Sequence, residues 1–179
     1  FADGGAQCFG RNIEGQLFLA DSDERFIGDD ELPRDVAGID IPDGQRFFRV
    51  STGTYTTCAV TNLDSDNLFC WGGISTSQLA LKSGERRANK RLASHISFMD
   101  TQVDLQGHIA IDVSIGTHHQ CVLLEDNSLA CWGVGEYDST LLLGSGSAAD
   151  ISDPERIIAD GAVDFGALNN SIASVSVKL

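Results

Sequence analysis

The cysteines are the residues whose type and spacing point most clearly to a chemistry, the formation of disulfide bonds. Cys58 and Cys70 flank one polar turn, and Cys121 and Cys131 flank another. If each hairpin pairs its residues about the middle of its turn, the two cysteines of each pair stand directly opposite each other. Cross-strand neighbours are close enough for a disulfide. The sequence therefore predicts the bonds Cys58–Cys70 and Cys121–Cys131.

Cys8 is the fifth cysteine and has the position of the second member of a third pair. Its partner would fall 10 to 12 residues upstream, before Phe1, so we expect Cys8 to be free in this chain. A cysteine pair in every unit favours an oxidising compartment, extracellular or periplasmic. The alternative is a cytoplasmic or nuclear protein in which these cysteines are unpaired apolar strand residues.

The elements that carry these cysteines recur along the chain. The tripeptide Cys-(aromatic)-Gly begins at Cys8, Cys70 and Cys131, at intervals of 62 and 61 residues. The motif Val-Ser-x-Gly-Thr begins at Val50 and again 63 residues later at Val113, in each case eight residues before a cysteine. A fixed period of this length is the signature of a repeat array.

Each unit contains short β-rich segments separated by turns. Cys58–Thr61 with Leu68–Trp71, and Cys121–Leu124 with Leu129–Trp132, are predicted hairpins. The Val-Ser-x-Gly segment is predicted to be a further strand, and the leucine-rich stretches at 78–81 and 141–143 a fourth. Four antiparallel strands per unit, without a helical pattern of convincing length, indicate an all-β partial β-propeller with four-stranded blades.

The repeat boundaries divide one propeller domain into parts. We expect residues 1–49 to be the latter part of one blade, 50–112 and 113–174 to be complete blades, and 175–179 to be the first strand of another. The sequence starts and stops inside a unit. We therefore expect a fragment of a longer array, whose remaining blades would be its neighbours.

The units resemble the regulator of chromosome condensation repeat. The segment Gly10–Leu17 matches the second half of that repeat closely, and the third unit carries its pattern at Gly116, His119, Val122, Leu123, Trp132 and Gly133. The resemblance implies a seven-bladed propeller, of which this chain supplies between two and three blades. Thr56 replaces the histidine of the repeat in the middle unit, and Ile74 and Ser77 replace its asparagine and glycine, so the function of one particular family member does not follow.

The repeated aromatic and glycine residues are expected to be structural. Phe9, Trp71 and Trp132 should pack between neighbouring blades, because a position that recurs in every unit suits packing better than ligand stacking. The repeated glycines should permit turns or a close approach of strands; they are Gly10, Gly53, Gly72, Gly116 and Gly133. His118 and His119 would point to opposite faces of a strand and make a poor metal pair. We expect no metal site and no cofactor.

Acidic residues outnumber basic ones by 26 to 12, which gives a formal net charge of −14. This balance argues against nucleic acid or an anionic membrane as a partner. Many of the acidic residues lie between Asp21 and Asp43, where we expect a solvated loop. A calcium loop is the sharper alternative, but Asp21-Ser22-Asp23 lacks the spaced glycine and terminal glutamate of such a loop. No apolar run approaches the length needed to insert into a membrane.

One segment of opposite charge is specific to the middle unit. It contains Lys82, Arg86, Arg87, Lys90 and Arg91. Arginine suits polar protein contacts because its donors form a planar array. We hypothesise that this segment binds an acidic protein or glycan; the alternative is a loop that only aids solubility.

The sequence contains no nucleophile elbow, phosphate-binding loop or spaced metal cluster, and so it predicts no enzyme. We expect a non-enzymatic protein-binding propeller scaffold whose variable connections form the contact surface. Two alternatives remain open. One is a guanine nucleotide exchange factor-like module for a small GTPase, and the other is an extracellular or envelope structural repeat protein.

Overall fold

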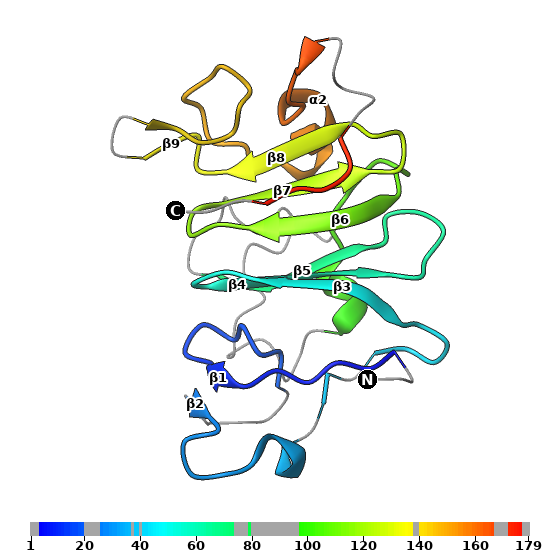
Figure 1. Ribbon diagram of the computed structural model, residues 1–179, viewed down its shortest axis with the longest axis vertical. Coiled ribbons are helices and arrows are strands. Elements are labelled where there is room, and N and C mark those ends of the chain that lie inside the picture. Colours follow the sequence, from blue (N-terminus) through cyan, green and yellow to red (C-terminus); the bar gives the residue numbers. More distant parts are fainter. Residues whose placement is uncertain are drawn as a thin grey trace.

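The computed structural model describes residues 4–19, 26–36, 38–39, 41–73, 79, 97–137, 140–166 and 172–176. The described chain is almost entirely β-structure. Two three-stranded antiparallel sheets lie next to each other, and the N-terminal segment lies beyond the first of them (Figure 1). Among the described residues, no helix is both long and apolar enough to cross a lipid bilayer.

The two sheets have the same topology. The first consists of β3 (Phe47–Thr52), β4 (Thr56–Thr61) and β5 (Leu68–Gly72), in the order β3-β4-β5. The second consists of β6 (Ala110–Ile115), β7 (His119–Leu124) and β8 (Leu129–Gly133), in the order β6-β7-β8. Both inner strands shift register near their start, between Phe47 and Arg49 and between Ala110 and Asp112. The all-β propeller prediction is confirmed.

Residues with left-handed backbone angles set the ends of the third strand in each sheet. Asp66 (φ 45°) and Asn127 (φ 66°) precede β5 and β8, and both residue types tolerate this conformation. Gly72 (φ 86°) and Gly133 (φ 120°) end the same strands. A Cβ atom at either glycine would collide with the main-chain carbonyl oxygen of the opposing strand. Glycine is therefore required there, as the repeat pattern predicted.

The outer edge of each unit binds a connecting segment at the same place. The main-chain N–H of Val103 donates to Leu68 O (2.9 Å), and that of Val163 donates to Leu129 O (2.9 Å). Only isolated bridges form at these edges, Phe69 with Gln102 and Ala130 with Ala162. The outer position of each blade is thus held by a short connector contact.

The predicted fourth strand at 141–143 is wrong in detail. Leu141 pairs with Glu136 in a small separate hairpin of β9 (Glu136–Tyr137) and β10 (Thr140–Leu141). Leu143 is buried in the core and contributes packing there. The corresponding stretch at 78–81 lies outside the described residues except for Leu79, which is buried.

The remaining elements are short. They are β1 (Gly10–Arg11), β2 (Phe26–Ile27), the 3-10 helices η1 (Pro33–Asp35), η2 (Phe98–Thr101) and η3 (Pro154–Arg156), and the helix α2 (Ile157–Asp160). β1 pairs antiparallel with β2. Residues 172–176 include no strand, but Val175 N donates to Asp112 Oδ2 (3.4 Å) beside β6.

One hydrophobic core joins the two sheets, with Trp71 and Trp132 fully buried in it. Trp71 lies against Phe18 of the first unit, with ring centroids 5.6 Å apart, and against Phe98 of η2 at 6.0 Å. Packing between units is therefore confirmed for Trp71. The same expectation for Phe9 is wrong, because its side chain is 67% exposed. No described segment covers this ring on its solvent side.

Candidate interaction site

The inner strands of the two sheets contact each other through positions that are equivalent in the repeat. Arg49 Nε lies 3.9 Å from Asp112 Oδ1, and Thr54 Oγ1 lies 3.4 Å from Thr117 Oγ1; both pairs are 63 residues apart. A Cβ atom at Gly53 would approach Gly116 O to 2.7 Å. Contacts between equivalent positions are what blades arranged about a common axis require. They also explain why Gly53 is a glycine.

Asp66 and Asn67 hold the connector that leads from the first sheet to the second. Asp66 Oδ1 accepts hydrogen bonds from Leu105 N (2.9 Å) and Gly107 N (3.0 Å). Asn67 Oδ1 accepts from Ala110 N (2.7 Å), and Asn67 Nδ2 donates to Ala110 O (3.0 Å). These bonds determine where β6 begins. The sequence interpretation treated both residues only as part of a turn and missed this role, since their partners lie about 40 residues away.

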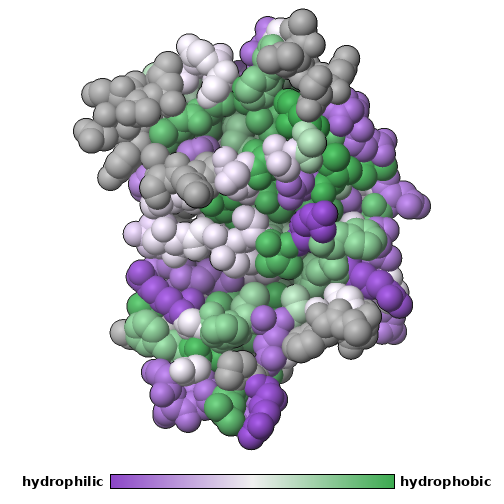
Figure 2. All heavy atoms as spheres, in the orientation of Figure 1, coloured by the Kyte–Doolittle hydropathy of each residue, from purple (hydrophilic) through white to green (hydrophobic). Residues whose placement is uncertain are grey.

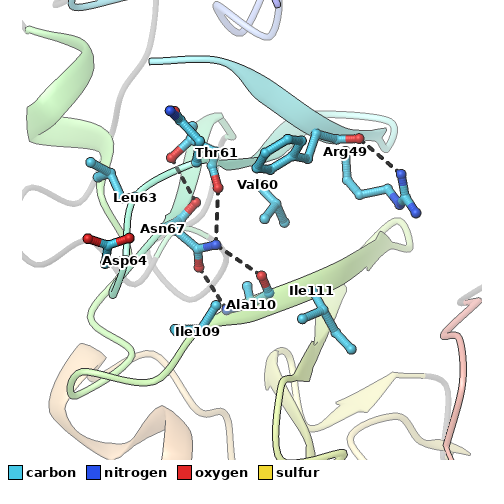
Figure 3. Close-up of a pocket in the computed structure, with 11 residues that line it drawn as sticks. Arg49, Val60, Thr61, Leu63, Asp64, Asn67, Ile109, Ala110 and Ile111 are labelled. Atoms are coloured by element: carbon cyan, nitrogen blue, oxygen red, sulfur yellow. Dashed lines mark hydrogen bonds between the residues drawn. The ribbon is translucent and has the colours of Figure 1, made fainter. Parts of the chain in front are cut away.

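A groove of about 460 Å³ lies between the β3–β4 hairpin and the start of β6 (Figure 3). Its apolar lining comes from both sheets and comprises Phe48, Val60, Leu63, Ile109, Ala110 and Ile111. Phe48 is 61% exposed and Ile111 is 42% exposed, although both are large hydrophobic residues. The bonded side chain of Asn67 supports the groove from below, between Thr61 and Ala110.

Opposite charges stand at the two ends of this groove. Figure 3 shows Asp64 beside Leu63 at one end and Arg49 at the other. The guanidinium of Arg49 donates to Phe48 O (3.1 Å) and also lies near Asp112. The lining contains no serine, cysteine or histidine. The arrangement suits the binding of an apolar side chain flanked by polar groups.

His119, which matches the histidine of the resembled repeat, lies on β7 and is almost completely buried. It stands opposite Gly133 in the β7–β8 register. Burial lowers its pKa below the ordinary value, and neighbouring His118 lowers it further. Its Nδ1 atom has no hydrogen-bond partner in the described part of the chain. We interpret His119 as a neutral structural residue.

The charged segments singled out in the sequence are only partly described. Asp29, Asp30 and Glu31 place carboxylate oxygens within 4.8 Å of one another, but Asp29 and Asp30 are exposed and Glu31 is only partly buried. Solvated carboxylates of this kind are common without a metal. The residues of the acidic stretch from Asp21 to Glu24 lie outside the described residues. So does the whole basic segment: Lys82, Arg86, Arg87, Lys90 and Arg91.

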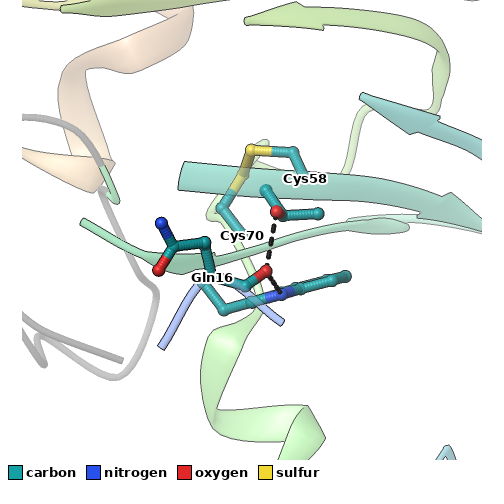
Figure 4. The surroundings of a disulfide bond; sticks show 5 residues. Gln16, Cys58 and Cys70 are labelled. Atoms are coloured by element: carbon teal, nitrogen blue, oxygen red, sulfur yellow. Dashed lines mark hydrogen bonds between the residues drawn. A yellow bond between two sulfur atoms is a disulfide. The ribbon is translucent and has the colours of Figure 1, made fainter. Parts of the chain in front are cut away.

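The cysteines lie where the hairpin argument predicted. Cys58 is directly opposite Cys70, and Cys121 is directly opposite Cys131. Each pair forms a disulfide with a Cα–Cα distance of 4.1 Å (Figure 4). All four residues are buried. Cys8 is a free, partly buried thiol.

Solved structures share this fold, while no family model matches the chain. Human WBSCR16 superposes with a TM-score of 0.56 at 14% identity, over 92% of this chain and 36% of that one. Prp20p from Saccharomyces cerevisiae gives 0.58 at 15% identity, over 91% and 40%. Yeast RCC1 (Prp20) bound to Kap60 gives 0.54 at 16%, over 82% and 31%.

The chain therefore spans well under half the length of each of these proteins. Identities this low establish similarity of fold and leave activity and partners open. Both sheets, the equivalent inner-strand contacts and these superpositions agree. The chain has the fold of the RCC1-type β-propeller.

Proposed function

We propose that this chain is a non-enzymatic, protein-binding part of a β-propeller. The observation that carries the proposal is the groove between β3 and β6, where Phe48 and Ile111 leave apolar surface exposed on an otherwise well-packed scaffold. Exposed apolar surface with a polar rim is characteristic of protein contact sites. Aromatic anchors at such sites often carry much of the binding energy.

The scaffold suits this role because its rigid and variable parts are separate. Strand registers, disulfides and outer-edge bonds recur from unit to unit, whereas the connections between strands differ in length and charge. Variable loops on a constant framework provide specificity without a change of fold. This division favours recognition over catalysis as the function of the chain.

The test is to place a photo-crosslinking amino acid at Phe48 and, as a control, at Leu32, which is also exposed. Leu32 lies outside the groove lining. The proposal predicts a defined protein crosslinked from position 48 and absent from position 32. Equal crosslinking from both positions to the same mixture of proteins would contradict a dedicated groove.

The basic segment is the second proposed contact. We propose that Lys82, Arg86, Arg87, Lys90 and Arg91 bind an acidic protein or glycan, since they concentrate positive charge on a chain of net charge −14. The triple change Arg86→Ser, Arg87→Ser, Arg91→Ser should weaken binding most at low salt, where electrostatic contact is least screened. Arg34→Ser removes an exposed arginine elsewhere and serves as the control.

An exchange-factor role is the alternative favoured by the fold. Prp20p was studied for its binding properties to Gsp1p and histones, and it superposes on 91% of this chain. This alternative predicts faster release of a labelled guanine nucleotide from a small GTPase when the chain is added. It also predicts a nuclear or cytoplasmic protein with reduced cysteines.

The two disulfides support an extracellular or periplasmic location, which also suits the third possibility of a structural repeat protein. That possibility predicts no crosslinked soluble partner from position 48 but regular self-association. Thiol titration of protein isolated from its native compartment separates the locations. Paired cysteines favour the oxidising compartment, and reduced cysteines favour the exchange-factor alternative.

A further inference from the structure

The first unit contains a segment that corresponds to β5 and β8 but lacks their inner partner among the described residues. Its outer edge is occupied in the usual way, since Ile39 N donates to Ala6 O (3.0 Å) as Val103 and Val163 do in the later units. Gly10 has the same left-handed backbone (φ 109°) as Gly72 and Gly133. The segment from Ala6 to Gly10 is therefore already placed as the third strand of a blade.

On the inner side of this segment, where β4 pairs with β5 in the next unit, there is a groove of about 400 Å³. One wall is Gln7–Phe9, and the other includes Val50 and Thr52 of β3. Phe9 is 67% exposed, whereas Trp71 and Trp132 at the equivalent positions are fully buried. Val50 is also largely exposed. The groove thus leaves uncovered the aromatic position that neighbouring structure covers in the other units.

Cys8 lines this groove at the position equivalent to Cys70 and Cys131. Both of those cysteines are bonded to a cysteine on the adjacent inner strand. Burial raises the pKa of the Cys8 thiol. Because the thiolate is the reactive form, Cys8 should react slowly with a thiol reagent that does not dock in the groove.

We propose that this groove is a strand-acceptor site, which binds an antiparallel β-strand of the β4 and β7 type and bonds Cys8 to the cysteine of that strand. The groove has the required neighbours on both sides, namely the free edge of one unit and the inner strand of the next. Main-chain pairing would supply affinity, and the cysteine opposite Cys8 would supply specificity.

The occupant is a repeat strand whose cysteine is not already bonded. Neither β4 nor β7 qualifies, because each is paired on both edges and its cysteine is in a disulfide. A second copy of the chain offers only its own Cys8 as a free cysteine. We therefore assign the groove to a strand from a further repeat unit of this type and not to a dimer.

The experiment uses the full chain and a peptide with the sequence of residues 47–61, whose cysteine carries a thiopyridyl disulfide. The Cys8 thiol gives its proton to buffer, and its sulfur attacks the peptide cysteine sulfur. A new S–S bond forms as the old one breaks, and thiopyridone is released. Absorbance of thiopyridone gives the rate, and peptide mapping locates the new bond.

We expect the repeat peptide to react at Cys8 at least about tenfold faster than a scrambled peptide with the same activated cysteine. Phe9→Ser should reduce this preference, and Leu32→Ser, outside the groove, should leave it unchanged. Equal rates for the two peptides would overturn the proposal, because Cys8 would then be merely an accessible thiol. A Cys8–Cys8 dimer that forms in preference to the peptide adduct would also overturn it.

Discussion

The indole N–H of Trp71 donates a hydrogen bond of 3.0 Å to the main-chain carbonyl of Gln16, in the preceding unit (Figure 4). Thr57 Oγ1 donates to the same oxygen (2.8 Å). The tryptophan of the repeat therefore fills the space between units and also fixes their relative position through a polar bond. A phenylalanine at this position could provide only the packing.

Trp71→Phe should lower the free energy of unfolding by about 1–3 kcal/mol, from the lost hydrogen bond and the smaller ring. Chemical denaturation measures this difference. Phe26→Leu changes an exposed aromatic residue and should cost much less. Equal losses for the two variants would show that Trp71 does not join the units.

Asn67→Ala should cost about 2 kcal/mol or more, because it leaves buried main-chain groups of Ala110 without partners. Asp64→Ala lies in the same turn but is exposed, and it should change stability by less than about 0.5 kcal/mol. Denaturation of both variants provides the comparison. Hydrogen exchange at Ala110 should increase only in Asn67→Ala; unchanged exchange there would contradict the connector role.

The disulfides should resist reduction in the folded protein, because all four cysteines are buried away from a soluble thiol. Non-reducing peptide mapping should find Cys58 with Cys70, Cys121 with Cys131 and Cys8 free. Replacing Cys58 and Cys70 together by serine should cost about 3 kcal/mol on the loop-closure estimate. Four or five reactive thiols in folded, oxidised protein would refute this pairing.

His119 should make the protein less stable at mildly acidic pH. Its folded pKa is lowered from 6.5 by burial, so the unfolded chain binds the proton more readily. Stability should therefore fall as the pH drops from about 6.5 towards the folded pKa, with no contribution from this group well above 6.5. His119→Thr introduces the residue type found at Thr56 in the first sheet and should flatten the pH dependence in this window. An unchanged slope in the variant would disprove the assignment.

Elements set by local pattern could be predicted from the sequence, and elements set by distant contacts could not. The register of Cys58 with Cys70 follows from a short polar turn between two β-rich segments, because pairing about the turn leaves little choice. The connector bonds of Asp66 join it to Leu105 and Gly107, and nothing in the local sequence marks those partners. The exposure of Phe9 likewise depends on which segment covers it, although its repeat position suggests burial.

The groove itself was also beyond sequence reasoning. Phe48 and Ile111 lie on strands of different units, and each reads as an ordinary strand residue. Only the side-by-side placement of β3 and β6 brings them to one groove, with Asp64 and Arg49 at its ends. Other hydrophobic patches on the face seen in Figure 2 are separated by hydrophilic residues, as is usual for a protein surface.

The most direct test of the binding proposal is the affinity of the groove variant for the partner crosslinked at position 48. The double change Phe48→Ser, Ile111→Ser should raise Kd at least about tenfold, because it removes the apolar anchors at both sides of the groove. Leu32→Ser should bind as the unaltered chain does, and circular dichroism should show that all three proteins are folded. An unchanged Kd for the folded double variant would contradict the proposal that this groove is where the propeller binds protein.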